Sequence, residues 1–465
     1  MYFEPLTQED VLNIIEKEEP MGTMIMFGGQ TALNLSEELE RQGIRILGTS
    51  YEGIDLCEDR KRFSILLKKL GINQPRGGYA TSFDEAREIA KRIGFPLLVR
   101  PSYVIGGQSI EKVNSVDELF EYLSHALDLS PLRPVLIDEY IEGIEVEVDA
   151  VSDAEDVLIP GIIEHIEKAG IHSGDSFALF PAKSLSELEE KEIVRCVEKI
   201  SKAVNVKGLI NIQFIVKEGK VYVIEVNPRA SRTVPIISKV TGIPMIKLAV
   251  EIALGNNLKE LGYYEPFYPK VPYTVVKAPI FSLEKLPGVE VALGAEMKSI
   301  GETLGIDFDY HNALYKAFKS AHLDVPSTGK VLLSFPEKVV SWSKSFVKYL
   351  QSCGYELWGT SGTAEAFKLM DIKIKEIDHE KSLELVKKRY FSMVINLPSK
   401  GKNVSNFGFK LRRTCLENSI PLFTALETAH KSIEATKNSR MTKNNVQSLN
   451  EYVDCYHNLQ ISKKR

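Results

Sequence analysis

Residues Leu209–Arg229, LINIQFIVKEGKVYVIEVNPR, carry the strongest fold signal in the chain. Two runs rich in β-branched residues flank Glu218-Gly219-Lys220, which predicts a β-hairpin with a three-residue, glycine-containing loop. A loop of this length places Gln213 opposite Glu225. The stretch therefore predicts two antiparallel strands with a defined register.

The two faces of this hairpin differ in chemistry, because side chains alternate along a strand. One face should pack against a core and carries Ile212, Phe214, Val216, Tyr222, Ile224 and Val226. The other face gathers Asn211, Gln213, Glu225 and Asn227, close enough across the pair to converge on one object. Hard oxygen ligands of this kind suit Mg²⁺ that also holds nucleotide phosphates.

An ordinary half-exposed sheet face is the alternative interpretation of the polar residues. Arg229 and Arg232 follow the hairpin directly. Cations next to an acidic metal site favour a substrate with anionic oxygens. The arginines therefore favour the metal-site interpretation over the alternative.

Composition bounds the class of protein. A chain of 465 residues should hold two to four domains, and 44% hydrophobic and 26% charged residues are typical of a globular protein in water. A net charge of -5 argues against nonspecific nucleic-acid binding. Charged residues interrupt the best candidate membrane span, five scattered cysteines have no CxxC spacing, and Met1 opens no signal peptide. We expect a cytoplasmic protein with reduced thiols.

Strand and helix patterns divide the chain into blocks. Residues 1–57 alternate helix and strand, with strands at Thr23–Phe27 and Ile44–Leu47 and a helix from Gly28 to Gln42. Residues 58–325 form a long mixed block, and residues 326–433 alternate strand and helix again. A polar tail is expected over 434–465. The predicted fold class is α/β and α+β.

The mixed block contains three further candidate binding elements. The strand Leu97–Val99 delivers Arg100 to a glycine-bearing loop with Gly106 and Gly107, whose backbone N–H groups could cradle phosphate. Backbone groups near Glu139 and Ile141 could read an adenine edge, with Glu145 on the ribose. A loop of small residues surrounds one histidine and consists of Gly170, Ile171, His172 and Ser173. Each element alone has an ordinary structural explanation.

Together these elements resemble the ATP-grasp fold. The motifs RPSYVIGG, EHIEKAGIHSGDS, NIQFIVK and IEVNPRASRTVP, in this order, are similar to the C-terminal half of the carbamoyl phosphate synthetase large subunit, as is PGVEVALGAEMKSIGE. The resemblance spans about residues 1–430. It implies a partial pre-ATP-grasp Rossmann-like domain, an ATP-grasp domain and a terminal methylglyoxal-synthase-like domain. Biotin carboxylase shares the fold, but its multi-glycine loop with a lysine is absent from the sequence.

The resemblance implies a role for each motif residue. ATP would be contacted by Arg60, Arg100, Gly106, Gly107, Glu139, Ile141, Glu145, Gly170, Ile171, His172, Ser173, Gln213 and Glu225. Gln213, Glu225 and Asn227 would hold Mg²⁺ or Mn²⁺, with K⁺ a further candidate ion. Arg229 and Arg232 would neutralise the transferred phosphoryl group and the carbamate. The implied reaction is phosphorylation of carbamate by ATP to give carbamoyl phosphate, a step in pyrimidine and arginine synthesis.

The family also implies partners that lie outside this sequence. The first half of the large subunit makes carboxyphosphate and reacts it with ammonia, and a small subunit hydrolyses glutamine. Neither is part of this chain, so we do not expect it to complete the synthesis from bicarbonate alone. A higher oligomer is possible in such an assembly, while nucleic acid and membrane partners are not expected.

Regulatory residues are implied in the terminal domain. Thr360, Thr363 and Asn396 suit a nucleotide-type effector, and His379 lies near the place where bacterial members use a lysine. Glu167, Asp175 and Thr424 occupy the positions of ornithine contacts in some members, but Ala278 stands where those members have an acidic residue. The sequence therefore names no effector.

Two other functions are compatible with these motifs. One is a different carboxylate-directed or biotin-directed ATP-grasp ligase. The other is a nucleotide-binding regulatory or scaffold subunit without turnover. A degenerate site should have lost Glu225, Asn227 or Arg100, and the chain retains all three.

Overall fold

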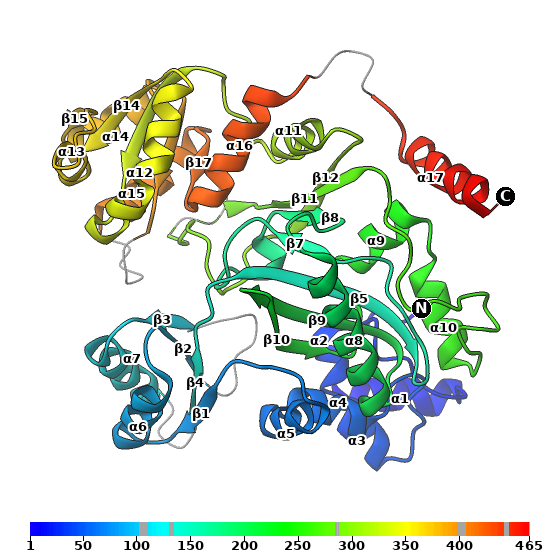
Figure 1. Ribbon diagram of the computed structural model, residues 1–465. Coiled ribbons are helices and arrows are strands. Elements are labelled where there is room, and N and C mark those ends of the chain that lie inside the picture. The colour runs from blue at the N-terminus through cyan, green and yellow to red at the C-terminus, as the bar shows by residue number, and fades with distance from the viewer. Residues whose placement is uncertain are drawn as a thin grey trace.

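Three sheets organise the chain in the computed structural model, which describes residues 1–101, 110–129, 134–283, 286, 288–398, 406–440 and 446–464. Figure 1 shows a small lobe around β1–β4, a large sheet from β5 to β12, and a terminal domain around β13–β17. The small lobe and the terminal domain lie on the same side of the large sheet, one below the other in this view. The candidate site residues lie on the large sheet and on the lobes that border it.

The first block is mostly helical. Its helices are α1 (Gln8–Glu18), α2 (Gly29–Leu33), α3 (Ser36–Arg41) and α4 (Tyr51–Glu58). The prediction of two strands at Thr23–Phe27 and Ile44–Leu47 is wrong. Within the described residues, the two segments form only one parallel bridge, between Thr23 and Ile46. The single helix expected from Gly28 to Gln42 is likewise divided into α2 and α3.

The small lobe is a four-stranded sheet with two helices. After α5 (Arg60–Leu70), the strands are β1 (Gly77–Ala80), β2 (Leu97–Pro101), β3 (Glu111–Val113) and β4 (Val135–Glu139), in the order β1-β4-β2-β3. Helices α6 (Phe83–Ile93) and α7 (Val116–Leu129) pack against the strands, and together they form the core of the lobe. The predicted strand Leu97–Val99 is confirmed and extends to Pro101.

The large sheet has the order β10-β9-β5-β7-β8-β11-β12, with β6 paired to β5. Its strands are β5 (Ile144–Asp153), β6 (Val157–Leu158), β7 (Ile163–His165), β8 (Ala178–Phe180), β9 (Lys207–Lys217), β10 (Lys220–Asn227), β11 (Thr274–Ile280) and β12 (Gly301–Asp307), with a 3-10 turn at Ser173–Asp175. Helix α8 (Glu187–Val204) packs on the face that carries Ile212 and Phe214. Helices α9 (Val234–Thr241) and α10 (Met245–Ala253) pack with Val151 and Leu209, whose side chains point to the opposite face.

The predicted hairpin is present, but its turn is shorter than expected. Lys217 pairs with Lys220, so the turn holds only Glu218 and Gly219, both with positive φ. The register then shifts by one residue between Val223 and Glu225. Because of the shorter turn, Val221 and Val223 lie opposite Val216 and Phe214 and point into the core, and the expected core positions Tyr222 and Ile224 do not. Beyond the bulge Glu225 faces Gln213, as predicted.

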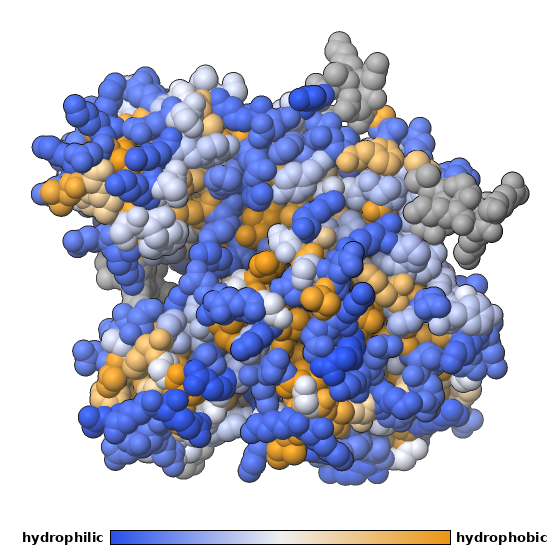
Figure 2. Space-filling view, viewed as in Figure 1, coloured by the Kyte–Doolittle hydropathy of each residue, from blue (hydrophilic) through white to orange (hydrophobic). Residues whose placement is uncertain are grey.

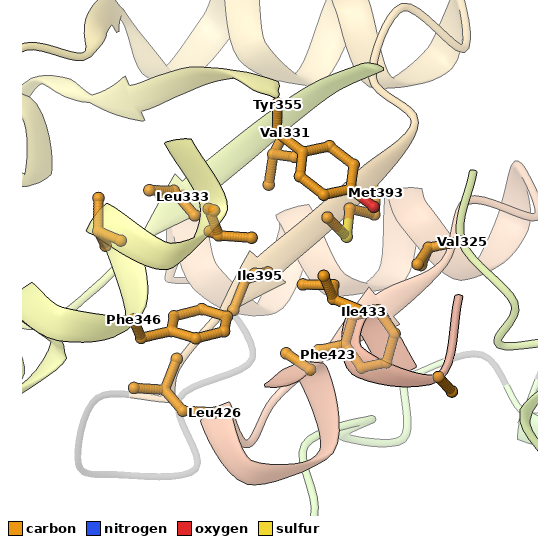
Figure 3. Close-up of a cluster of buried hydrophobic side chains, with 14 of the residues drawn as sticks. Val325, Val331, Leu333, Phe346, Tyr355, Met393, Ile395, Phe423, Leu426 and Ile433 are labelled. Atoms are coloured by element: carbon orange, nitrogen blue, oxygen red, sulfur yellow. The ribbon is translucent and has the colours of Figure 1, made fainter. Parts of the chain in front are cut away.

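The terminal domain is a five-stranded parallel sheet in the order β15-β14-β13-β16-β17. Its elements are β13 (Gly329–Ser334), α12 (Glu337–Ser352), β14 (Tyr355–Thr360), α13 (Ser361–Lys368), β15 (Lys375–Ile377), α14 (His379–Lys387), β16 (Met393–Asn396), α15 (Phe407–Glu417), β17 (Leu422–Phe423) and α16 (Leu426–Asn438). Figure 3 shows Val331, Leu333 and Ile395 facing Phe346 and Ile433 in its core. The alternation of strand and helix predicted for residues 326–433 is confirmed.

The terminal domain shares its core with the large sheet. Helix α11 (Tyr310–Ser320) follows β12 and packs against α16. Phe177 and Phe318 stack at 4.5 Å within the cluster that also contains Leu333. Ala278 is fully buried in the same cluster. The two units therefore meet through apolar packing as well as through polar contacts.

The expected polar tail contains a docked helix, α17 (Leu449–Lys464). Tyr452 and Tyr456 are 3% and 1% exposed and lie one helical turn apart. Their hydroxyls donate to the carbonyls of Ile306 at 3.1 Å and Pro269 at 2.5 Å. The apolar content of the segment is low because tyrosines supply most of its buried face, which explains why composition did not reveal it.

The described part of the chain contains no helix long and apolar enough to cross a membrane. Figure 2 shows one face of the molecule, which is mostly hydrophilic, with hydrophobic residues gathered mainly toward the middle of the view.

Candidate active site

The far end of the β9–β10 hairpin brings the predicted metal ligands together. Glu225 pairs with Gln213 across the strands, and the Asn227 amide donates to Glu225 Oε1 at 2.9 Å. The amide of Gln213 donates to Ser173 Oγ at 3.3 Å. Glu225 is exposed although it lies within a strand. One carboxylate and two amides therefore share one side of the hairpin end, next to the loop at residues 170–173.

Asn211 lies opposite Asn227 across the two strands. It is 2% exposed, and its amide donates to Asp149 Oδ1 at 3.0 Å. It therefore belongs to the buried layer between β5 and β9, beside Asn227, which is 7% exposed, whereas Glu225 is exposed.

The two predicted arginines border this group. Arg229 donates to Asn227 Oδ1 at 3.4 Å and to the Ala230 carbonyl at 3.2 Å, and its buried Nε has no hydrogen-bond partner. Arg232 donates to Ser299 Oγ at 2.9 Å and to the Ser299 carbonyl at 3.3 Å. A buried donor without a partner is rare in folded proteins and suits an anionic oxygen.

The first block also reaches this site. The Ala230 N–H donates to the Met26 carbonyl at 2.9 Å, and the Gln30 amide donates to Glu58 Oε2 at 3.1 Å. Burial raises the pKa of Glu58, which lies within electrostatic range of Arg229 and Glu225. Sequence patterns gave no reason to place Glu58 near the hairpin, because the contact joins residues far apart in the chain.

The two walls predicted to enclose a nucleotide lie side by side. The Tyr140 hydroxyl donates to the Ala169 carbonyl at 2.7 Å, which ties residues 139–141 to the loop at residues 169–173. Gly170 adopts a φ of +108°, a conformation that favours glycine. The His172 ring accepts the Gly174 N–H at 3.1 Å, and burial lowers the pKa of this histidine.

Other residues of these walls have identified partners. Ile141 is 5% exposed. The Glu139 carboxylate forms a two-pronged ion pair with Arg76, at 2.9 Å for each contact, and this contact lowers the pKa of Glu139. Glu145 is buried, with Oε1 at 3.3 Å from the Nδ1 atom of His165.

Two predicted phosphate-binding arginines converge on one carboxylate. Asp138 Oδ2 lies 2.9 Å from Arg100 Nη2 and 3.8 Å from Arg60 Nη1. Burial raises the pKa of Asp138 to about 6, although Arg60 opposes the shift. The Nε of Arg100 is buried and has no hydrogen-bond partner. Gly106 and Gly107, predicted to cradle phosphate, lie outside the described residues.

A buried acidic row on β5 lies behind the open group. Glu145, Glu147 and Asp149 occupy alternate positions on one face of the strand and are 5%, 3% and 0% exposed. Burial alone would lower the pKa of His165, but Glu145 and Glu147 outweigh it and raise the pKa to about 9. The Thr233 hydroxyl donates to both Glu147 and Asp149. This row thus connects the strand to the residue that follows Arg232.

The Lys277 ammonium donates to the Ser173 carbonyl at 2.8 Å and is itself 4% exposed. Neither Lys277 nor the acidic row was predicted. The sequence of β5 does show an acidic residue at every second position. This alternation alone does not identify the hydrogen-bond partners and cations that offset the cost of burying the carboxylates.

The predicted regulatory residues of the terminal domain are buried at the carboxyl ends of its strands. Thr360, Thr363 and Asn396 are 5%, 2% and 2% exposed. The two threonine hydroxyls lie 3.0 Å apart, and Thr363 Oγ accepts the Phe335 N–H at 2.9 Å. The carboxyl ends of parallel strands are where such folds bind ligands. His379 stacks on Phe407 at 3.8 Å, beside an open pocket lined by Ser361, Gly362, Asp378 and Glu380.

The donor set can be tested against the divalent ion that the resemblance implies. Within the described residues, no group of three or more His, Cys, Asp or Glu side chains is arranged to hold a metal. The candidate site offers one exposed carboxylate, Glu225, with the amide oxygens of Gln213 and Asn227 as further hard donors. Such a set fits Mg²⁺ that takes its remaining ligands from phosphate and water.

Three family models match the chain along most of its length. They are the carbamoyl phosphate synthase preATP-grasp domain over residues 1–56, the carbamoyl-phosphate synthase L chain, ATP binding domain over 59–261, and the MGS-like domain over 344–424. The sheets and the site described above define a protein of the ATP-grasp class with a terminal MGS-like domain. The chain belongs, as a segment, to the family of carbamoyl phosphate synthase large chains.

Curated relatives support this assignment. The large chain of Thermoanaerobacter sp. (strain X514) is 59% identical over 97% of this chain, and that of Clostridium beijerinckii is 48% identical over 92%. This chain spans only 42% and 41% of the length of these relatives.

Solved structures share the fold of about two thirds of the chain. The biotin carboxylase domain of Hydrogenobacter thermophilus 2-oxoglutarate carboxylase, crystallised with MgADP, ADP and bicarbonate, matches with a TM-score of 0.57 at 20% identity, over 69% of this chain and 79% of that one. The Campylobacter jejuni biotin carboxylase in complex with a β,γ-ATP compound gives 0.55 at 18% identity, over 68% and 77%. At these identities the likeness concerns the fold alone.

Proposed function

We propose that this chain phosphorylates carbamate with ATP to form carbamoyl phosphate, as the C-terminal half of a carbamoyl phosphate synthase large chain. The observation that carries the proposal is the convergence of Gln213, Glu225 and Asn227 beside Arg229 and Arg232 at one end of the hairpin. One carboxylate, hard amide oxygens and two guanidinium groups suit a site for phosphoryl transfer between anions. Relatives that are 59% identical over 97% of this chain are carbamoyl phosphate synthase large chains.

The nucleotide would lie between the two walls joined by Tyr140 and Ala169. Glu139 and Ile141 would form one side of the adenosine pocket, and residues 170–173 the other. Glu145 would accept from the ribose hydroxyls. Arg100, supported by Arg60 and Asp138, would contact the phosphates through its unpaired Nε.

Gln213, Glu225 and Asn227 would hold Mg²⁺ or Mn²⁺. When bound, such an ion supplies charge neutralisation between the terminal phosphates. K⁺ is a further candidate ion for this chain. The protein residues do the positioning, since the hairpin register sets Glu225 and Gln213 opposite each other before any ligand arrives.

The chemistry needs no covalent intermediate with the protein. A carbamate oxygen attacks the γ-phosphorus, a new P–O bond forms, and the bond to the β-phosphate oxygen breaks to release ADP. Arg229 and Arg232 would neutralise charge on the transferred group and the acceptor. Alignment of donor and acceptor would supply most of the remaining rate enhancement.

Carbamate is short-lived in water, so the chain needs a source of it close by. We therefore propose the N-terminal half of a large chain and a glutaminase small subunit as partners, with a cytoplasmic assembly as the setting. The chain covers less than half of its relatives, which is consistent with the first reaction steps residing in sequence outside it.

The reverse partial reaction tests the proposal, because it requires only this half of the process. Wild-type chain supplied with carbamoyl phosphate, ADP and Mg²⁺ should form ATP, detected with a coupled luciferase assay. Glu225→Gln and Asn227→Ala should each lower the rate about 100-fold or more, as expected for groups that stabilise developing charge.

Glu218→Gln is the matched control, because it makes the same chemical change at the opposite end of the same hairpin. Its rate should equal that of the wild type. Equal rates for Glu225→Gln and Glu218→Gln would remove the metal assignment. Absence of ATP formation by the folded wild-type chain, together with tight ADP binding, would favour a regulatory subunit without turnover.

A further inference from the structure

One segment, Glu290–Ser299, connects the terminal domain to the candidate active site, and we call it the bridging segment. At its start, the Glu290 carboxylate forms a two-pronged ion pair with Arg412 of α15, with Nε to Oε1 at 2.7 Å. The Arg412 side chain is 4% exposed and that of Glu290 is 20% exposed. Glu290 Oε1 also accepts the Ala292 N–H at 2.9 Å. The pair therefore fixes the course of the segment from its first residues.

Arg412 also contacts a residue of the predicted regulatory pocket. Its Nη1 donates to Asn396 Oδ1 at 2.5 Å, at the carboxyl end of β16. Next to it, the Leu293 N–H donates to Thr424 Oγ at 3.3 Å. The terminal domain thus holds the start of the bridging segment through a guanidinium and a hydroxyl, and the Asn396 carboxamide holds the guanidinium.

The end of the bridging segment is attached to the loop predicted to bind the nucleotide. Asp175 is fully buried, and its carboxylate accepts the N–H groups of Lys298 at 2.9 Å and Ser299 at 2.8 Å. Between the two ends, the Gly294 carbonyl accepts the His172 N–H at 2.8 Å. Movement of the segment would therefore displace the backbone on which His172 stands.

Ser299 is the last link to the reacting groups. Its hydroxyl donates to the Gly174 carbonyl at 3.0 Å and accepts from Arg232 Nη1 at 2.9 Å, and its carbonyl accepts from Arg232 Nη2. Both terminal nitrogens of Arg232 thus depend on one residue of the bridging segment. A planar guanidinium held at both ends has a defined direction.

We propose that the Glu290–Arg412 pair is a positioning device that sets the guanidinium of Arg232 through the bridging segment. The proposal rests on the proposed function for its effect on rate, and on the contacts above for its effect on structure. Neither Glu290 nor Arg412 contacts the hairpin residues, so both act through Ser299.

The energetic cost of removing two charges from water favours a specific role for this pair. An ion pair that is largely removed from water loses much of the hydration of both ions and serves stability poorly compared with apolar packing. The two-pronged geometry fixes the orientation of the Glu290 carboxylate relative to Arg412 and the distance between them. Removing one partner leaves the other as an uncompensated buried charge, so the pair should remain closed in the folded chain. It can therefore hold the segment in one place.

The test uses the full chain with Glu290→Gln, Ser299→Ala and the double variant, in the assay that forms ATP from carbamoyl phosphate and ADP. Glu290→Gln should lower kcat by roughly tenfold, because a small displacement of a positioned group is costly. The KM for ADP should stay within about twofold, since the adenosine walls are unchanged. The double variant should be no slower than the slower single variant, because both act on Arg232 along one route.

Hydrogen exchange supplies a second measurement that does not depend on turnover. The amides of His172, Lys298 and Ser299 should exchange faster in Glu290→Gln than in the wild type, while amides in α8 should not change. Arg412→Lys keeps the positive charge but loses the two-pronged contact with Glu290. It should therefore speed exchange and lower kcat, as Glu290→Gln does, but by a smaller amount. It also serves if Glu290→Gln fails to fold.

Glu417→Gln is the matched control, because Glu417 lies on the same helix as Arg412, pairs with Arg413 and makes no contact with the bridging segment. It should match the wild type in both measurements. Unchanged exchange in Glu290→Gln would overturn the positioning role, whatever the activity. Faster exchange in a wild-type-like fold that forms no ATP would leave the positioning role standing and count against the proposed function alone.

Discussion

Glu167 is a buried carboxylate that links the large sheet to the terminal domain. It is 2% exposed, and its two oxygens accept the Phe177 N–H at 2.8 Å and the Thr428 hydroxyl at 2.6 Å. Burial raises its pKa to about 7, although these hydrogen bonds oppose the shift. The folded chain therefore retains a proton on Glu167 at pH values where an unfolded glutamate has released it.

This residue predicts a pH dependence of stability. A raised pKa contributes stability that is complete below the ordinary value of 4.5 and is lost as the pH rises to about 7. The loss is at most about 3 kcal/mol. Glu167→Gln should remove it, because the amide oxygen can still accept the Phe177 N–H while the amide nitrogen donates to the Thr428 hydroxyl. The variant should therefore gain in thermal midpoint relative to the wild type between pH 5 and pH 8.

Calorimetry or thermal circular dichroism at both pH values measures this difference. Glu384→Gln is a suitable control, because Glu384 is an exposed helical glutamate with surface ion pairs. A difference between wild type and Glu167→Gln that does not change with pH would show that Glu167 is ionised throughout.

At the scale of the element, the turn of the β9–β10 hairpin controls where Glu225 points. Glu218 and Gly219 have φ values of 50° and 76°, the pattern of a two-residue type I′ turn. A slip of one residue would exchange the two faces of the hairpin. The bulge at Ile224 corrects the register between the turn and the site.

The positive φ values of this turn predict that one substitution stabilises the chain and another destabilises it. Glu218→Asn should raise stability by about 0.5–1 kcal/mol, because asparagine tolerates positive φ better than glutamate. Gly219→Val should lower it by more than about 1 kcal/mol, since a β-branched residue is strained at this φ, even though open space surrounds the position. Thermal unfolding of the two variants measures both effects. Equal midpoints for the two variants would contradict the assignment of the turn.

Sequence patterns predicted the hairpin and the alternating order of the terminal domain, because each depends on local periodicity. They did not predict the bulge, since a two-residue turn with a bulge and a three-residue turn both place Gln213 opposite Glu225. They also missed β15, whose three residues Lys375–Ile377 carry almost no pattern. Asp138, Lys277 and Ser299 were missed because their partners lie far away in sequence.

At the scale of the whole molecule, α17 joins the end of the described chain to the large sheet. Tyr452 packs edge-on against Tyr273 at 5.4 Å, and Tyr456 against Tyr268 at 6.3 Å. Gly242, at the end of α9, leaves room for this helix, because a Cβ there would lie 2.8 Å from the His457 ring. Helix α9 begins two residues after Arg232, so α17 braces an element that borders the candidate active site.

Replacing both tyrosines with alanine should release α17, because each large buried side chain contributes about 3 kcal/mol or more. Limited digestion with endoproteinase Glu-C followed by mass spectrometry should then find rapid cleavage after Glu451 in the double variant and slow cleavage in the wild type. Tyr456→Phe, which loses only the hydrogen bond to Pro269, should resemble the wild type. Identical digestion of wild type and double variant would contradict the docking of the helix.

The docked C-terminal helix also limits how far the terminal domain can travel. The chain enters this domain after α11 and leaves it through α16, and α17 then anchors it back on the large sheet. Six residue steps separate Arg440 from Val446, and they can span at most about 22 Å. A domain attached at both ends can make small rotations relative to the large sheet but cannot separate from it. Any effect of this domain on the candidate active site must therefore come from small displacements.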